Sequence, residues 1–179
     1  MINKKIKNLL FFLRKNKTFQ KHLNKVCYLD PLTNVYNLNA FYQFIDNLQE
    51  GDWYFVDVDD FKLFNSGHGH HVGSMILKKY ANYLVYALGS QGEVFRVGGD
   101  EFVIYIPKNL SIKIGELEKF TCIYNNNSFL IQSTIVEIKF YREITCDKID
   151  FESSFFEAQN KLRNEKREKI ETVYDTFIS

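Results

Sequence analysis

The residues best suited to chemistry are carboxylates that stand at the ends of two predicted strands. Asp100 and Glu101 follow Gly98-Gly99 between the β-prone runs 93–97 and 102–106, the pattern of a β-hairpin with an acidic tip. The two glycines allow positive φ angles in the turn and close approach of a ligand. Two adjacent carboxylates repel each other unless a cation binds, and Mg²⁺ prefers one or two carboxylates together with phosphate oxygens. The alternative is an ordinary turn whose acids face solvent.

A second pair of carboxylates follows the apolar run Trp53–Val56, where a strand is predicted to end. Alternate side chains of a strand share a face, so Asp57 and Asp59 lie on one face and Val58 on the other. A strand end that carries carboxylates beside an acidic hairpin is the layout of a palm-type nucleotidyl-transfer site. Metal ions held there bind the attacking and leaving oxygens of an in-line displacement at phosphorus. The two stretches together indicate metal-assisted phosphoryl transfer.

Four segments of the chain occur with the residues, order and spacing of the motifs of one enzyme family. They are Asp30-Pro31-Leu32-Thr33-Asn34-Val35-Tyr36-Asn37, Asp57–Asn65, Gly69-His70-His71-Val72-Gly73 and Gly98-Gly99-Asp100-Glu101-Phe102. The chain therefore resembles the GGDEF family, the diguanylate cyclases, over residues 30–106, with a weaker match at Arg163-Asn164. The resemblance implies an enzyme that condenses two GTP into cyclic di-GMP and releases two pyrophosphates.

The resemblance implies a catalytic centre made of residues from both acidic segments. Asp57, the carbonyl of Val58 and Asp100, assisted by Glu101, would hold two Mg²⁺ or Mn²⁺ ions. Ions in this position activate the ribose 3′-hydroxyl and orient the α-phosphate, and Asp100 is a candidate acceptor for the hydroxyl proton. Lys62 would lie near the phosphates and offset charge in the transition state. A solvated surface charge is the alternative interpretation of Lys62.

The resemblance also implies a set of nucleotide contacts. Asn65 offers a donor and an acceptor to the guanine edge, and His70 lies beside the nucleotide at the start of a helix. Arg163 is a candidate phosphate contact or an ordinary helix-surface charge. The family lysine four residues before it is Gln159 here, and Lys161 is a candidate substitute. The full expected set is Phe61, Lys62, Asn65, His70, Ser74, Gly98, Gly99 and Arg163.

Ser74 is the main departure from the family pattern at the nucleobase. The family normally has Asp at this position, where the carboxylate accepts hydrogen bonds from guanine N1–H and the exocyclic amine. A serine hydroxyl can donate or accept, so an adenine edge is rejected less strongly. A subset of the family carries Ser here, uses ATP as well as GTP, and makes cyclic AMP-GMP. The alternative is that Asn65 and the shape of the pocket still select guanine.

Other departures bear on regulation and activity. Gly89 and Gly92 stand where the family's product-binding Arg and Asp would precede the signature, so we predict no feedback site for cyclic di-GMP. Leu38 replaces a family Arg, and the family's Ser-x-Gly step in the strand over 129–140 is not recognisable. These changes keep open a hypothesis from another functional class, a catalytically weak domain that binds GTP or a protein partner.

Length and composition predict a cytoplasmic protein that is large enough to bury a core. The chain has 179 residues, 45% of them hydrophobic, and its net charge of +1 gives no reason to expect a nucleic-acid polymer as partner. The cysteines Cys27, Cys122 and Cys146 are odd in number and lack metal-ligand spacing, which favours reduced thiols. No apolar run approaches the roughly 20 residues of a membrane span, and no signal peptide is predicted.

The chain divides into an N-terminal region, residues 1–29, and a predicted catalytic domain, residues 30–179. The first region carries eight Lys and Arg and no acidic residue, and Ile6, Leu9 and Leu13 fall at helical spacing. This basic amphipathic helix packs on the domain or on a second copy, contacts an anionic membrane surface, or is a connector to a sensor module. No sensor module is recognisable in the sequence, so we expect any regulation to come from a separate protein or from expression level.

The expected fold is α+β: a central, mostly antiparallel sheet with a ferredoxin-like βαββαβ core, flanked by helices. Helices are predicted over 38–48, 71–88, 111–120 and 152–177, and strands over 53–57, 93–97, 102–106, 121–123 and 129–140. Because each copy binds one nucleotide, cyclisation requires two copies that face each other, so we expect a homodimer, at least a transient one. The expected small ligands are GTP, with ATP if Ser74 relaxes base selection, and a divalent metal.

Overall fold

A six-stranded sheet forms the centre of the computed structural model, which describes residues 17–18, 26–45, 51–108, 110–139, 141–142 and 149–178. Its strand order is β1-β3-β4-β2-β6-β5. The strands are β1 (Tyr36–Asn37), β2 (Gly51–Val58), β3 (Glu93–Arg96), β4 (Glu101–Pro107), β5 (Lys119–Tyr124) and β6 (Asn127–Glu137). Neighbouring strands pair antiparallel, except that β1 and β3 pair in parallel.

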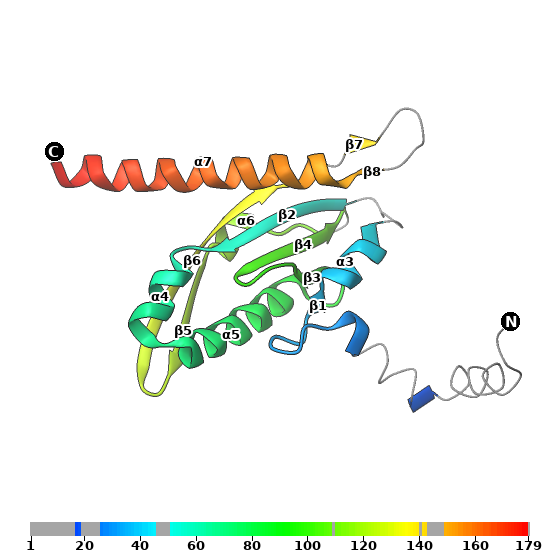
Figure 1. The fold of residues 1–179 in the computed structure, drawn as a ribbon, viewed down its shortest axis with the longest axis horizontal. Helices are drawn as coiled ribbons and strands as arrows, with labels where there is room; N and C mark the ends of the chain where they lie inside the picture. The colour runs from blue at the N-terminus through cyan, green and yellow to red at the C-terminus, as the bar shows by residue number, and fades with distance from the viewer. Residues whose placement is uncertain are drawn as a thin grey trace, which may run out of the picture.

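Helices cover both faces of this sheet (Figure 1). The long helix α7 crosses one face, and α5 packs on the other. A small ladder of β7 (Tyr141–Arg142) and β8 (Ile149–Asp150) immediately precedes α7. The helices are α3 (Leu38–Ile45), α4 (Phe61–His68), α5 (His70–Leu88), α6 (Ile114–Leu117) and α7 (Phe151–Ile178).

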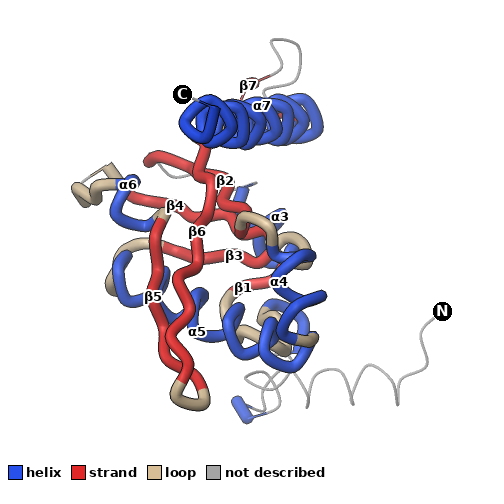
Figure 2. Tube along the Cα trace, turned by 90° about the vertical axis from the view of Figure 1, so that its left-hand side faces the viewer, coloured by secondary structure: helices blue, strands red, loops and turns tan. Residues whose placement is uncertain are grey.

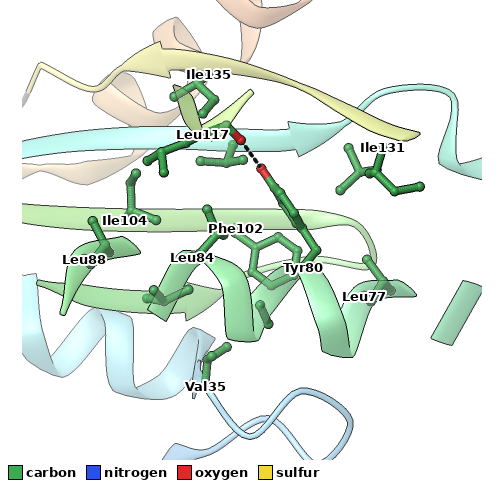
Figure 3. Packing of buried hydrophobic residues seen from close by; sticks show 14 of the residues in the cluster. Val35, Leu77, Tyr80, Leu84, Leu88, Phe102, Ile104, Leu117, Ile131 and Ile135 are labelled. Atoms are coloured by element: carbon green, nitrogen blue, oxygen red, sulfur yellow. Dashed lines mark hydrogen bonds between the residues drawn. The ribbon is translucent and has the colours of Figure 1, made fainter. Parts of the chain in front are cut away.

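One apolar cluster fills the space between the sheet and α5 (Figure 3). Phe102 and Ile104 of β4 point into it, and Leu84 and Tyr80 of α5 are fully buried against them. The Tyr80 hydroxyl donates a hydrogen bond to the carbonyl of Leu117 over 3.3 Å, so its one polar atom is satisfied inside the cluster. This packing fixes the position of α5, whose first turn borders the pocket described below.

A second, aromatic-rich cluster lies on the opposite face, under α3 and α7. Trp53 and Phe55 of β2 point into it, and Phe155 of α7 packs edge-on against Phe55 with ring centroids 4.9 Å apart. Because side chains alternate along a strand, Asp57 lies on this same face, directly opposite Glu101 of β4. The fold therefore places both carboxylates on the side of the sheet that α7 crosses.

The observed architecture confirms the predicted fold class and most predicted elements. The order β3-β4-β2-β6 is that of a ferredoxin-like core, with helices on both faces. Helix α4, the short edge strand β1 and the small β7–β8 ladder were not predicted. The helix predicted over 111–120 is wrong at its C-terminal end, because Lys119 and Phe120 pair with β6 as the start of β5. In this segment the alternating pattern of a strand, which buries Cys122, determines the structure, and the local helical pattern does not.

The predicted N-terminal helix falls largely on residues that lie outside the described part of the chain, as does Cys146. The first domain residues are described, and the bridge between Leu29 and Tyr36 joins the start of the domain to β1. None of the described helices is both long enough and apolar enough to cross a membrane.

Candidate nucleotide and metal site

Four carboxylates gather where β2 and the β3–β4 hairpin end. Asp57 lies opposite Glu101 in the antiparallel β2–β4 register, Asp59 follows the end of β2, and Asp100 immediately precedes β4. The backbone N–H of Val58 donates to the carbonyl of Asp100 over 3.2 Å, which holds the hairpin tip against the end of β2. The structure thus brings together the residues that the sequence assigned to metal binding.

Two lysines of α7 lie against these carboxylates. The ammonium of Lys166 is hydrogen-bonded to Asp57 Oδ1 and lies 3.4 Å from Asp59 Oδ1. Lys169 Nζ lies 3.6 Å from Asp59 Oδ2 and donates to Thr134 Oγ1 over 3.0 Å. Thr134, opposite Asp57 on β6, in turn donates to Asp59 Oδ1 over 2.7 Å. Helix α7 therefore supplies two positive charges to the carboxylate cluster.

The electrostatics of this cluster favour a cation. Burial raises the pKa of Asp57, and the charges of Asp100 and Asp59 add to the rise, although Lys166 acts in the opposite direction. Burial is also the main cause of the raised pKa of Glu101, followed by the charges of Asp57 and Asp100. Burial alone would lower the pKa of Lys166, but its hydrogen bond to Asp57 and the nearby carboxylates raise that pKa. The carboxylates therefore ionise at a cost that a cation relieves.

The donor set suits a hard divalent metal ion. Carboxylate oxygens and a backbone carbonyl are the ligands that Mg²⁺ and Mn²⁺ prefer. Within the part of the chain that the structure describes, no group of three or more His, Cys, Asp and Glu side chains is arranged to hold a metal ion by itself. Mg²⁺ commonly takes one or two carboxylates and completes its shell with water and phosphate oxygens. The residues present fit a metal site of that open kind.

Gly98 and Gly99 contribute to the hairpin because they have no side chain, and not because they adopt unusual backbone angles. The positive φ angles that these glycines allow are not adopted: in the described chain, positive φ occurs at Gly69, at Gly89 and at four Asn and Asp residues. The N–H groups of Val97 and Gly98 both donate to the carbonyl of Glu101, which closes a wider turn that needs no left-handed residue. A Cβ on Gly98 would lie 2.1 Å from Glu101 Oε2, so a side chain there would displace that carboxylate.

An ion pair that the sequence analysis missed connects the hairpin to the start of the domain. Arg96 Nη1 donates to Asp30 Oδ1 over 2.9 Å, and Arg96 Nε donates to the carbonyl of Gly99 over 3.2 Å. The backbone and hydroxyl of Thr33 also donate to Asp30 Oδ1, over 2.8 and 2.6 Å. Burial alone would raise the pKa of Asp30, but the hydrogen bonds from Thr33 and Arg96 outweigh it and lower the pKa.

A pocket of about 500 Å³ opens beside the carboxylates, between α4, α5 and the hairpin. Six of the nucleotide contacts expected from the sequence line it: Phe61, Lys62, Asn65, His70, Ser74 and Gly99. Asp100 also lines the pocket, which places the pocket directly beside the carboxylate cluster. Leu32, Ser66, Leu77 and Arg96 complete the lining.

The wall formed by α4 and α5 depends on close helix packing at Gly73. A Cβ there would lie 1.9 Å from Asn65 Oδ1 and 3.1 Å from Phe61 Cζ. The Asn65 oxygen is buried, and no described residue donates a hydrogen bond to it. Ser74, the next residue of α5, is half-buried and lines the same pocket. Asn65 and Ser74 thus bring hydrogen-bonding groups to one wall.

The cations that the sequence analysis expected on α7 lie elsewhere. Arg163 is exposed on α7 and is not among the residues that line the 500 Å³ pocket. Lys161 borders a separate hollow of about 260 Å³, together with Glu137 and Glu157. The helix instead directs Lys166, three residues beyond Arg163, at the carboxylates. In the sequence, Lys166 belongs to a basic run on a long predicted helix, and such a run does not show where each side chain points.

Sequence comparison relates the chain to one family. A family model described as diguanylate cyclase, GGDEF domain, matches residues 27–169. The chain is 38% identical over 55 residues to diguanylate cyclase DgcS of Shewanella oneidensis, covering 31% of this chain and 19% of that protein. It is 39% identical over 51 residues to diguanylate cyclase DgcZ of Escherichia coli K12, covering 28% of this chain and 17% of that protein. The chain therefore spans about a fifth of the length of these relatives.

Solved structures with the same fold include a diguanylate cyclase and a GGDEF domain with its coiled coil. Diguanylate cyclase SiaD of Pseudomonas aeruginosa, solved with its activator SiaC, superposes with a TM-score of 0.67 at 19% identity, covering 92% of this chain and 70% of that chain. The coiled coil and GGDEF domain of DgcB from Caulobacter crescentus, solved with c-di-GMP, superposes with a TM-score of 0.63 at 18% identity, covering 91% of this chain and 93% of that chain. At these identities the likeness shows the fold.

Proposed function

We propose, because the chain belongs to the GGDEF-domain family of diguanylate cyclases, that it condenses two GTP into cyclic di-GMP and two pyrophosphates. The observation that carries this proposal is the meeting of the nucleotide-sized pocket and the carboxylate cluster at Asp100. The pocket wall that contains Asn65 and Ser74 suits a base edge, and the carboxylates suit a metal–phosphate group. A nucleoside triphosphate carries the same two chemical parts at its two ends.

The side chains around the pocket have separate roles in the proposed reaction. Asp57 and Asp100 would hold a divalent cation, which would supply a lower pKa for the ribose 3′-hydroxyl and positive charge beside the α-phosphate. Asp100, which borders the pocket, accepts the hydroxyl proton. Lys62 lines the same pocket, and its ammonium offsets negative charge on the phosphate oxygens as pyrophosphate leaves. Glu101 and Asp57 are held opposite each other by the strand register and keep the cluster acidic.

Product formation in this proposal needs two copies of the chain. One pocket holds one nucleotide, so two pockets must face each other before both phosphodiester bonds can form. We extend this to a separate activating protein that promotes the facing arrangement, since the similar cyclase SiaD was solved with an activator. Gly89 and Gly92 offer no side chain to a bound product, so we propose that the cyclase lacks that feedback site.

The substitution Asp100→Ala tests the proposal. With GTP and Mg²⁺, it should reduce cyclic di-GMP formation by roughly 10²- to 10³-fold, because it removes a group that acts on the reacting atoms. Asp52→Ala, at the other end of β2, is the matched control and should retain activity. GTP binding, measured without turnover, should remain detectable in both variants. The proposal fails if the wild-type protein binds GTP and forms no cyclic product, or if Asp100→Ala forms as much product as wild type. The chain is then a GTP-binding domain and not a cyclase that uses Asp100.

A second candidate function is the hybrid cyclase that makes cyclic AMP-GMP, and Ser74 is the observation in its favour. Ser74 lines the pocket beside Asn65, where a hydroxyl tolerates either base edge. With equal GTP and ATP, the hybrid activity predicts cyclic AMP-GMP from the wild-type protein and mainly cyclic di-GMP from Ser74→Asp. Cyclic di-GMP alone from the wild-type protein in that mixture would exclude the hybrid activity.

A further inference from the structure

Lys166 lies in the part of the carboxylate cluster that a metal ion would need. Its ammonium is hydrogen-bonded to Asp57 Oδ1 and lies 3.4 Å from Asp59 Oδ1, so it contacts both carboxylates at the end of β2. The Lys166 side chain is 28% exposed and that of Asp57 is 16% exposed, so water screens this contact only in part. The contact is therefore stronger than an ordinary surface pair.

The packing of α7 explains why this lysine is directed at the cluster. Ala158 and Leu162 are buried against the sheet, and Lys166 continues the same helix face at four-residue spacing. Arg167, the next residue, is exposed. Figures 1 and 2 both show α7 lying along the sheet, so its inward face reaches the end of β2.

The Lys166 ammonium on Asp57 Oδ1 and a divalent cation at the same carboxylate would repel each other, so each would weaken the binding of the other. Lysine has a long flexible stem, so its ammonium can move several ångströms without movement of the helix. The neighbouring pocket meets the carboxylate cluster at Asp100, so a triphosphate bound there would bring negative oxygens to the same cluster. Such a ligand would offer the Lys166 ammonium a second partner.

We propose that Lys166 is a positioning residue that holds Asp57 in the nucleotide-free protein and moves to the nucleotide phosphates, so that metal binding depends on nucleotide. This inference rests on the proposed function, because it needs a polyphosphate ligand in the pocket. It predicts weak metal binding to the free protein. It also predicts that nucleotide and metal each increase the affinity of the protein for the other, and that the Lys166 ammonium accounts for part of this effect.

Metal binding without turnover tests the inference. Mn²⁺ binding to the full chain, followed by electron paramagnetic resonance without nucleotide, should tighten about tenfold in Lys166→Met. Arg167→Met removes the same charge one residue away, and Lys166→Arg keeps a cation at the site, so both should match wild type. Adding Asp57→Asn to Lys166→Met should abolish the gain. Equal affinity in Lys166→Met and wild type, or an equal gain in Arg167→Met, would overturn the inference.

The coupling to nucleotide gives a second readout. GTP with the α–β bridging oxygen replaced by methylene cannot release pyrophosphate, so it reports binding alone. It should tighten Mn²⁺ binding in wild type about tenfold more than in Lys166→Met. An equal effect in both proteins would overturn the inference even if the cyclase activity is established. Conversely, Lys166→Met could gain Mn²⁺ affinity without nucleotide, with the expected coupling, while the wild-type protein forms no cyclic product. That result would support the proposed role of Lys166 and contradict the proposed function.

Discussion

The carboxylate of Glu101 lowers the stability of the folded protein and at the same time contributes to the acidic cluster. Burial raises its pKa, and Asp57 across the strand pair adds to the rise. A raised carboxylate pKa means that the folded state binds protons more readily than the unfolded state. The cost in stability is therefore full above the raised pKa, and it shrinks to nothing as the pH falls to the ordinary value of 4.5. Like charges opposite each other on a sheet destabilise it by about 0.2–1 kcal/mol.

We therefore expect Glu101→Gln to raise the free energy of unfolding of the metal-free protein by about 0.5 kcal/mol at pH 7. The gain should shrink towards pH 4, and Mg²⁺ should stabilise the variant less than wild type. Thermal and urea unfolding across this pH range measure both effects. Glu116→Gln, at an exposed glutamate that pairs with Lys113, is the control and should show no such trend. A loss of stability in Glu101→Gln at pH 7 would contradict the account of the cluster.

Arg96 and Asp30 form the contact that fixes the hairpin tip, and their coupling can be measured. A double-mutant cycle of Asp30→Asn and Arg96→Gln should give a coupling energy of about 1–2 kcal/mol at pH 7, because the pair is largely shielded from water. The hydrogen bonds from Thr33 and Arg96 outweigh burial and depress the pKa of Asp30, so the stabilisation is present above its ordinary value of 3.8 and is lost as pH falls through the depressed pKa. Additive effects at pH 7 would show that the ion pair contributes nothing.

At the scale of elements, the contact between α4 and α5 sets the position of Asn65. Gly73→Ala should lower GTP affinity about tenfold and cost about 1–3 kcal/mol of stability, because its Cβ would lie 1.9 Å from Asn65 Oδ1. Gly67→Ala in α4 meets nothing within 4 Å and should instead stabilise the helix by about 0.5–1 kcal/mol, with GTP affinity unchanged. Calorimetric titration and urea unfolding of the two variants make the comparison. Equal GTP affinity in both would contradict this role of Gly73.

The elements that the sequence predicted well are those with a strong local pattern. The alternation in β2 and the turn between β3 and β4 were enough to predict carboxylates at a strand end beside an acidic hairpin, and the observed register puts Asp57 opposite Glu101. Helix α5 was predicted almost to its ends because its apolar residues Ile76, Tyr80 and Leu84 repeat at helical spacing and are all buried. The pocket residues came from motif resemblance, since no periodicity assigns a ligand contact.

The elements that sequence reasoning missed depend on contacts between distant parts of the chain. Strand β1 has two residues and exists because it pairs with β3. The Arg96–Asp30 pair joins residues 66 positions apart, and the Lys166–Asp57 contact joins residues 109 positions apart. Such contacts follow from the packing of whole elements, here the way α7 lies on the sheet. The turn between β3 and β4 was predicted, but its backbone closes without the positive φ angles that its glycines allow.

At the scale of the whole molecule, activity should depend on protein concentration. In the proposed reaction two pockets must meet to form one cyclic product, so the rate per protomer should rise with concentration until the dimer dominates. Cyclic di-GMP formation measured over a thousandfold range of protein concentration, with GTP in excess, gives this dependence. Sedimentation at the same concentrations should show the dimer forming over the same range. A rate per protomer that is constant while the protein stays monomeric would contradict the two-copy mechanism.

The most direct test of the central claim is identification of the product by mass spectrometry. The purified protein at high concentration is incubated with Mg²⁺ and GTP, and Asp100→Ala is treated in parallel. The account predicts cyclic di-GMP and two pyrophosphates per product from the wild-type protein, and at most a trace from the variant. Unchanged GTP in both samples, or the same product from both, would contradict the claim that the carboxylates at the end of β2 and the β3–β4 hairpin form a cyclase site.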